Sequence, residues 1–151
     1  MSNSSISSRQ KEIEKSTGDL YASIWDNFWT ESHNDTSSWE DFALASMVEW
    51  EPLPVAEDFF ENKRCLDAGT GMGRAARYFA QQGANEVIAL DVSPDCLRNA
   101  KVRNSDLGDK IKYVESSVLN IPYPDRSFDF VHCDGVIHHT VDPLRAFSEL
   151  V

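Results

Sequence analysis

The spacing of hydrophobic positions changes near residue 64 and divides the chain into two predicted parts. Before that point, apolar side chains fall three or four residues apart, which is the spacing of one face of a helix. This pattern predicts a helical cap over residues 19–61. A polar, serine-rich segment over residues 1–18 precedes it and is expected to be a disordered or loosely helical tail. The helices expected in the cap cover residues 19–29, 39–50 and 55–61.

From residue 64 onward, short apolar runs alternate with helical patterns. Strands joined to helices by short links form parallel sheets with right-handed crossovers. We therefore expect an α/β fold over residues 62–151, a Rossmann-like doubly wound parallel sheet. Ser93 followed by Pro94 marks one helix start, because serine caps a helix and proline fits its first turn. The expected strands are 64–67, 86–91, 111–115 and 128–133, and the expected helices are 73–82, 94–104 and 144–151.

Composition and charge narrow the class of protein. The 151 residues are 41% hydrophobic and 11% aromatic, which is ordinary for one globular domain. Of the net charge of −11, the first 60 residues carry −9, from 3 Lys/Arg and 12 Asp/Glu. This acidic lead segment disfavours nucleic acid as a partner. No apolar stretch reaches the roughly 18–20 residues that would span a membrane.

The three cysteines and the N-terminus bear on the compartment. Cys65, Cys96 and Cys133 have no metal-ligand spacing, and no metal site is expected. The N-terminus lacks the basic and apolar segments of a secretion signal. A reduced, cytoplasmic setting is the expectation.

The segment DAGTGMG, residues 67–73, carries the strongest chemical signal. A strand, a glycine turn and a helix start together build a nucleotide-shaped pocket. Arg74 stands where a dinucleotide fingerprint has its third glycine, and no phosphate-binding G-K-[S/T] motif occurs. Asp67 suits a ligand with an ammonium group, and Asp91, 20 residues beyond Gly71, can accept hydrogen bonds from ribose hydroxyls. These features favour a ligand with a ribose, an adenine and a cationic amino-acid tail, without phosphate.

Three blocks of sequence resemble class I S-adenosylmethionine-dependent methyltransferases of the UbiE-like, methyltransferase type 11 pattern. In order, they are LDAGTGMGR, EVIALDVSP and NIPYPDRSFDFVHCDGVIHHTVDPLRAFSEL, and the resemblance covers residues 64–151. It implies S-adenosyl-L-methionine as the cofactor and a small-molecule methyl acceptor. The family's sheet continues into further strands. We therefore expect a C-terminally truncated chain, with another chain or a missing C-terminal segment covering the edge of the fourth strand.

The resemblance also implies roles for individual residues. It places Asp91 at the ribose hydroxyls and Val92 on the adenine. Ser117 and Val118 occupy the stretch that reads the adenine edge, where the family commonly has aspartate at the position of Ser117. Cys133 would border the transferable methyl. The residues implied to lie beside the methionine part of the cofactor are Asp67, Gly69, Thr70, Gly71 and Gly73.

Several alternatives stay open at this stage. His138 and His139 follow the fourth expected strand, and histidine titrates near neutrality, so either could act as a base or merely pack. His138 is the candidate catalytic residue. Tyr21 is a candidate lid over the cofactor, whereas Trp25 is expected to pack on the sheet. The alternatives to a methyltransferase are a non-catalytic binding or partner module and, disfavoured by Arg74, an NAD-dependent oxidoreductase.

Overall fold

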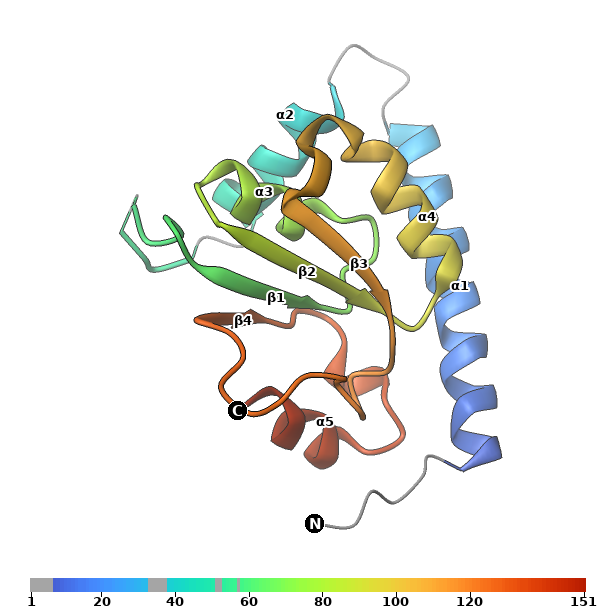
Figure 1. The fold of residues 1–151 in the computed structure, drawn as a ribbon. Helices are drawn as coiled ribbons and strands as arrows, with labels where there is room; N and C mark the ends of the chain where they lie inside the picture. The colour runs from blue at the N-terminus through green and yellow to red at the C-terminus, as the bar shows by residue number, and fades with distance from the viewer. Residues whose placement is uncertain (1–6, 33–37, 51–52, 57) are drawn as a thin grey trace.

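The computed structural model describes residues 7–32, 38–50, 53–56 and 58–151. Four parallel strands form one sheet in the order β3-β2-β1-β4 (Figure 1). The strands are β1 (Arg64–Ala68), β2 (Glu86–Asp91), β3 (Ile111–Glu115) and β4 (Phe130–His132). The chain adds β2 and β3 on one side of β1 and then returns to place β4 on the other side. The predicted Rossmann-like α/β fold is confirmed, and its strand order reverses between β1 and β4, where such sheets bind ligands.

Two strands depart from the predicted bounds: β1 runs one residue further than predicted, to Ala68, and β4 is shorter. β2 and β3 have the bounds expected from the sequence. The strand predicted over 128–133 is wrong at both ends, and Cys133 lies in the loop after β4. Asp129 Oδ2 accepts a hydrogen bond from the backbone N of Arg64 at 2.8 Å, which ties the segment before β4 to the start of β1. Within the described residues, β4 pairs with β1 on one side and with no strand on the other.

The first helix, α1 (Ser8–Ser32), begins earlier than the aromatic spacing suggests. Ser7 Oγ accepts from the backbone N of Gln10 at 3.2 Å, and the backbone N of Ser7 donates to Gln10 Oε1 at 2.8 Å. This reciprocal pair is a capping box, a signal that the sequence reasoning missed. Residues 8–18, assigned above to the tail, are therefore helical. The side chain of Trp25 lies outside the described ones, and its packing stays a prediction.

Two further cap segments follow, α2 (Trp39–Ala45) and the π-helical η1 (Ser46–Trp50). Together they cover the helix predicted over residues 39–50. The short helix predicted over 55–61 is wrong, because the described residues of that segment form bends and turns. In one of these turns the backbone N of Glu61 donates to the carbonyl of Asp58, three residues back, at 3.1 Å. In the part of the chain that the structure describes, no helix has the length and apolarity needed to cross a bilayer.

The predicted helices of the sheet domain are present: α4 starts at the predicted residue, and α3 and α5 start within one residue of it. Ser93 Oγ accepts from the backbone N of Cys96 at 3.3 Å, and Asp142 Oδ1 accepts from the backbone N of Arg145 at 3.0 Å. Both caps are followed by proline, which fits the first helical turn. The segments are α3 (Arg74–Gln81), α4 (Pro94–Arg103) and α5 (Pro143–Leu150), with short 3₁₀ turns η2 (Ser105–Lys110) and η3 (Ile137–His139).

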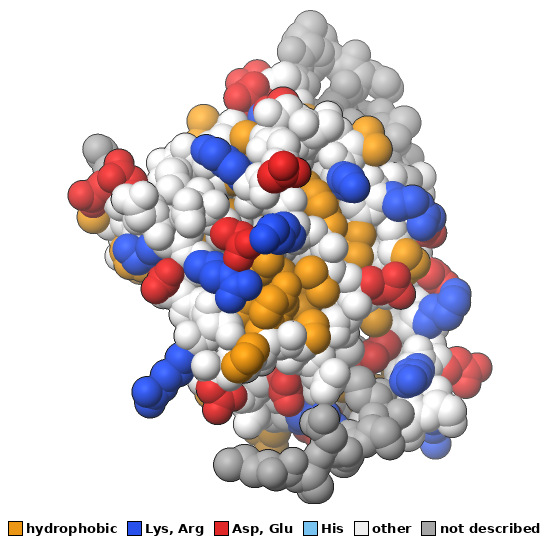
Figure 2. Space-filling view, in the orientation of Figure 1, with side chains coloured by type: hydrophobic (Ala, Val, Ile, Leu, Met, Phe, Trp, Pro, Cys, Tyr) orange, Lys and Arg blue, Asp and Glu red, His pale blue; other side chains and the backbone are white. Residues whose placement is uncertain are grey.

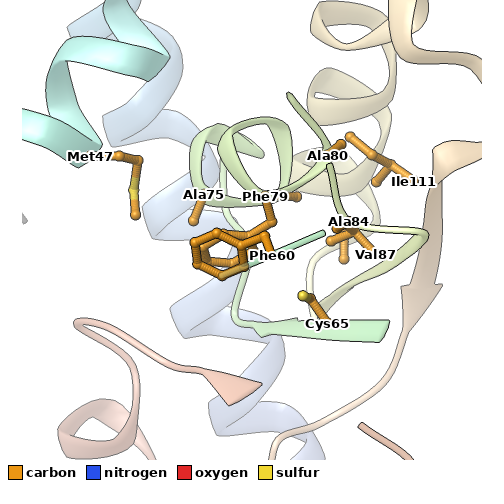
Figure 3. Packing of buried hydrophobic residues seen from close by; sticks show 11 residues of the cluster. Met47, Phe60, Cys65, Ala75, Phe79, Ala80, Ala84, Val87 and Ile111 are labelled. Atoms are coloured by element: carbon orange, nitrogen blue, oxygen red, sulfur yellow. The ribbon is translucent and has the colours of Figure 1, made fainter. Parts of the chain in front are cut away.

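Both faces of the sheet carry hydrophobic side chains, because successive residues of a strand point to opposite faces. On the face covered by α3, Phe79 stacks on Phe60 with ring centroids 4.9 Å apart, in a cluster that includes Val87 of β2 (Figure 3). On the other face, a second cluster joins Leu66 and Ile88 to α5. Figure 2 shows hydrophobic side chains gathered over the middle of the sheet, with charged side chains around them.

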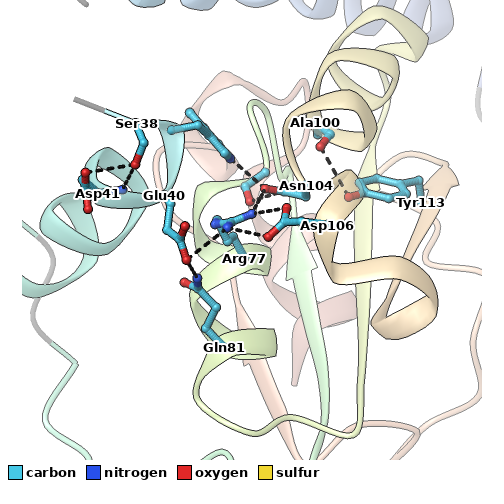
Figure 4. Close-up of polar contacts among 11 residues, drawn as sticks. Ser38, Glu40, Asp41, Arg77, Gln81, Ala100, Asn104, Asp106 and Tyr113 are labelled. Carbon is cyan, nitrogen blue, oxygen red and sulfur yellow. Dashed lines mark hydrogen bonds and ion pairs between the residues drawn. The ribbon is translucent and has the colours of Figure 1, made fainter. Parts of the chain in front are cut away.

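A polar network joins the cap to the sheet domain (Figure 4). Trp39 Nε1 of α2 donates to Asn104 Oδ1 at 2.7 Å, and Asn104 Nδ2 donates to the carbonyl of Gly73 at 2.9 Å. Arg77 of α3 binds both carboxylate oxygens of Asp106, at 2.7 and 2.8 Å. The network fixes α2, α3, the end of α4 and the glycine loop relative to one another.

Candidate functional site

A cavity of about 300 Å³ lies at the carboxyl ends of β1, β2 and β4, with α1 forming one wall. It occupies the point where the strand order reverses. Its lining residues from α1 and the glycine loop are Glu14, Thr17, Gly18, Tyr21, Asp67, Gly69, Thr70, Gly71, Met72, Arg74 and Ala75. Those from the later strand ends are Asp91, Val92, Cys96, Ser117, Val118, His132, Asp134, Gly135, Val136, His139 and Thr140. All but three of the predicted site residues are brought together here, the exceptions being Gly73, Cys133 and His138.

The glycine loop needs glycine for two reasons: its backbone has positive φ angles, and neighbouring atoms leave no room for a Cβ. Gly69 and Gly73 have φ values of 83° and 81°, which side-chain-bearing residues rarely adopt. A Cβ on Gly73 would lie 2.7 Å from Asn104 Nδ2 and 2.8 Å from Ala100 Cβ. Gly73 therefore lets the start of α3 approach α4, as the third glycine of a dinucleotide loop lets helix and strand approach. The position was predicted to lie beside the ligand, and it is absent from the cavity lining.

Asp67 holds the loop in place. One carboxylate oxygen, Oδ2, accepts from Thr70 Oγ1 at 2.6 Å and from the backbone N of Ala76 at 3.1 Å. The other, Oδ1, lies 2.8 Å from His132 Nδ1. His132 is not among the site residues expected from the sequence. The parallel register of β1 and β4 places His132 beside Asp67. Aligning these two strands in the sequence is the step that could have identified His132 as a site residue.

Asp91 closes β2 with a buried carboxylate, 9% exposed. Its Oδ2 accepts from the backbone N of Gly71 and its Oδ1 from that of Ser93, both at 2.9 Å. Burial raises the pKa of Asp91 and the nearby charge of Asp67 adds to the rise, while hydrogen bonds from backbone N–H groups oppose it. A carboxylate has about four acceptor positions, so Asp91 can accept further hydrogen bonds from a ligand in the cavity.

Near Asp91 the cavity is also lined by apolar side chains. Val92 and Val118 line it together with Cys96, and Ser117 stands at its edge. Ser117 Oγ accepts from the backbone N of Leu119 at 3.0 Å and donates to a carboxylate of α1. This end suits a flat, largely apolar ring with a polar edge.

At the opposite end, Tyr21 and His139 meet across the cavity. Tyr21 Oη lies 2.6 Å from His139 Nε2, which joins α1 to η3. The ring of His138 contacts that of His139 in a tilted arrangement, with centroids 3.9 Å apart, but His138 does not line the cavity. Cys133 belongs to the second hydrophobic cluster, where burial raises the pKa of its thiol to about 11. At neutral pH that thiol is therefore protonated.

The charge of the lining selects among ligands. Four carboxylates line the cavity (Glu14, Asp67, Asp91 and Asp134) against one guanidinium, Arg74. Arg74 itself lies 3.7 Å from Asp134. Such a lining favours a ligand with positive charge and hydroxyl donors, and it repels phosphate. Among the described residues, no three His, Cys, Asp or Glu side chains are placed to hold a metal ion.

Comparisons with known proteins agree with this geometry. A family described as "Methyltransferase domain" matches residues 66–151. An uncharacterized chloroplastic methyltransferase of Arabidopsis thaliana is 34% identical over 109 residues, which are 66% of this chain and 31% of that protein. A ubiquinone biosynthesis O-methyltransferase of Aliivibrio fischeri is 35% identical over 83 residues, 54% of this chain and 35% of that protein.

A solved structure extends the likeness to three dimensions. The crystal structure of an S-adenosylmethionine-dependent methyltransferase from Aquifex aeolicus is 29% identical, with a TM-score of 0.54. The match covers 60% of this chain and 50% of the Aquifex chain. The chain thus spans about a third of the length of these two curated relatives and half of this structural neighbour.

Proposed function

Because the chain belongs to the methyltransferase domain family, we propose that it forms the cofactor-binding part of an S-adenosylmethionine-dependent methyltransferase acting on a small molecule. S-adenosylmethionine is the cofactor that this family membership implies. The observation that carries the proposal is the cavity where the strand order reverses, with a carboxylate at the end of β2 beside a bare glycine backbone. Its negative lining suits a sulfonium and opposes the pyrophosphate of a nicotinamide cofactor.

The cavity residues fit the parts of this cofactor. Asp91 would accept from the ribose hydroxyls, and Val92 and Val118 would hold the adenine ring. The glycine loop, fixed by Asp67, would lie beside the methionine part. When bound, the cofactor supplies an electrophilic methyl group on a sulfonium. The chain's own contribution is to bind and orient the two reactants, which lowers the barrier by positioning.

For the acceptor side we propose His139 in place of His138. His139 faces the cavity and is hydrogen-bonded to Tyr21 at 2.6 Å. If the acceptor is a hydroxyl, it must lose a proton as its oxygen is methylated. The Tyr21 hydroxyl would pass its own proton to His139 Nε2 and receive the acceptor's proton. The Aliivibrio relative is named as an O-methyltransferase, which is consistent with a hydroxyl acceptor.

The acidic charge of the chain, −11, supports a small molecule over nucleic acid. The three cysteines are free, which supports a reducing compartment such as the cytoplasm. The Arabidopsis relative carries "chloroplastic" in its name, and targeting experiments in the source organism would separate the two compartments.

Calorimetry with S-adenosylhomocysteine tests cofactor binding. We expect measurable binding by the chain and at least about tenfold weaker binding by Asp91→Ala, because a hydrogen bond to a charged group contributes about 1.5–3 kcal/mol. Asp109→Asn, on exposed η2, is the matched control and should bind like the unchanged chain. A binding signal in titrations with NAD, together with no binding signal for S-adenosylhomocysteine, would overturn the proposal.

Product formation tests catalysis. The chain is incubated with S-adenosylmethionine and a panel of phenols, catechols and small amines, and S-adenosylhomocysteine is measured. Tyr21→Phe should lower the rate with a hydroxyl acceptor about a hundredfold, within the usual contribution of proton transfer. Its binding of S-adenosylhomocysteine should change by less than about threefold. Binding without any turnover across the panel would favour the non-catalytic binding module instead.

A further inference from the structure

A residue of α1 lines the cavity beside Ser117. Glu14 lines the cavity, and its Oε1 accepts a hydrogen bond from Ser117 Oγ, 103 positions later in the sequence. Ser117 is buried, and its oxygen already accepts from the backbone N of Leu119 at 3.0 Å. The serine proton is therefore committed to Glu14. Of this pair, the glutamate carboxylate is the group that keeps acceptor positions for a ligand.

The surroundings make this an acceptor at the edge of an apolar slot. Val92, Cys96 and Val118 supply the apolar walls. The ion pairs of the described residues include none with Glu14. An ionised carboxylate accepts hydrogen bonds and donates none. A ring held in the slot must therefore present a donor, such as an exocyclic amino group, at the edge that meets Glu14.

We propose that Glu14 recognises the amino edge of the ligand's base and makes the site selective for adenosyl over 6-oxopurine ligands. This rests on the proposed function, because it takes the cavity to be the S-adenosylmethionine site. At the position of Ser117 the sequence lacks a carboxylate, and α1 supplies one from outside the sheet. Selectivity for the base then depends on α1 lying over the cavity.

The placement of Glu14 is fixed by the packing of α1. Gly18, one turn further along the helix, lies directly against the loop after β2. A Cβ at Gly18 would be 3.1 Å from Ser93 Cβ and 3.3 Å from Val92 Cγ1. This close approach holds the preceding turn, with Glu14, against the adenine end of the cavity.

The test compares two ligands that differ at one edge of the base. S-adenosylhomocysteine has a 6-amino group, whereas S-inosylhomocysteine has a 6-oxo group and a protonated N1. Calorimetry on the 151-residue chain should show a preference of about ten- to a hundredfold for the adenosyl ligand, the range expected when a buried polar group loses its partner. In Glu14→Gln the preference should fall to within about threefold, because an amide can both accept and donate.

Two further variants separate recognition from folding. Glu12→Gln, exposed on the same helix, should keep the full preference. Adding Ser117→Asp to Glu14→Gln should restore it, because a carboxylate returns to the same edge from the β3 side. Thermal unfolding of each variant checks that the helix remains in place.

Each outcome has a distinct meaning. If the unchanged chain binds both ligands equally, or if Glu14→Gln keeps the full preference, Glu14 does not read the base. If the unchanged chain binds neither ligand, the proposed function fails, which is a separate result.

Discussion

At the residue scale, Asp67 and Asp91 stand at the same end of neighbouring strands, but their carboxylates have different partners. Both oxygens of Asp67 are bonded within the protein, to the glycine loop, to α3 and to His132. Asp91 is bonded to two backbone N–H groups and borders the cavity. Asp67 therefore shapes the site, and Asp91 is the carboxylate suited to meet a ligand.

Because the pKa of Asp91 is raised, its proposed role in binding the ligand can be tested by varying the pH. Ribose hydroxyls donate to the ionised carboxylate, so protonation of Asp91 competes with ligand binding. We expect the affinity for S-adenosylhomocysteine to fall as the pH drops through the raised pKa of Asp91, by up to about tenfold per pH unit for one proton. Calorimetry at a series of pH values from neutral downward, through the raised pKa of Asp91, measures the slope. Asp91→Asn should bind weakly with a flatter profile, and an unchanged slope in that variant would assign the proton to another group.

At the scale of elements, α1 spans the whole cavity and is tied to it at three points. Glu14 meets Ser117 at one end, Tyr21 meets His139 at the other, and Gly18 packs between them. A side chain larger than hydrogen at Gly18 must push α1 away from the loop after β2. The helix thus closes the site only because a glycine stands at its point of closest approach.

Substitution at Gly18 tests this closure. Gly18→Leu should weaken binding of S-adenosylhomocysteine by at least about tenfold, because it separates α1 from the cavity while leaving the sheet intact. Ser23→Leu, exposed on the same helix, is the control and should bind normally. Stopped-flow measurement should show faster ligand release from Gly18→Leu. Unchanged affinity and release would mean that α1 does not cover the bound ligand.

The elements also show what the sequence could and could not predict. β2, β3 and the capped helices α4 and α5 follow from local signals, namely apolar runs and the caps of Ser93 and Asp142. The glycine loop and Asp91 follow from motif spacing. The pairs Glu14–Ser117 and Tyr21–His139 do not, because each joins residues more than 100 positions apart. Such contacts depend on where α1 docks, which no local pattern specifies.

At the scale of the whole molecule, the cap and the sheet domain are joined through buried polar groups. Arg77, 2% exposed, binds Asp106 with two hydrogen bonds and also lies 3.5 Å from Glu40 of α2. The Arg77 guanidinium lowers the pKa of Asp106, so this pair stabilises the fold above the ordinary carboxyl pKa. That stabilisation is lost as the pH falls through the lowered value. Asn104 connects the same network to the glycine loop.

Asn104 is where stability and binding should change together. Asn104→Ala would remove the acceptor of half-buried Trp39 Nε1 and the donor to the carbonyl of buried Gly73. An unsatisfied buried group costs about 1–3 kcal/mol, so we expect the free energy of unfolding in urea to fall by about 1–3 kcal/mol, mainly through the Gly73 carbonyl. Because the Gly73 carbonyl belongs to the glycine loop, affinity for S-adenosylhomocysteine should fall as well. Asn120→Ala, exposed, should change stability by less than about 0.5 kcal/mol. A variant at Asn104 that loses stability but binds normally would show that the network holds the cap without shaping the ligand site.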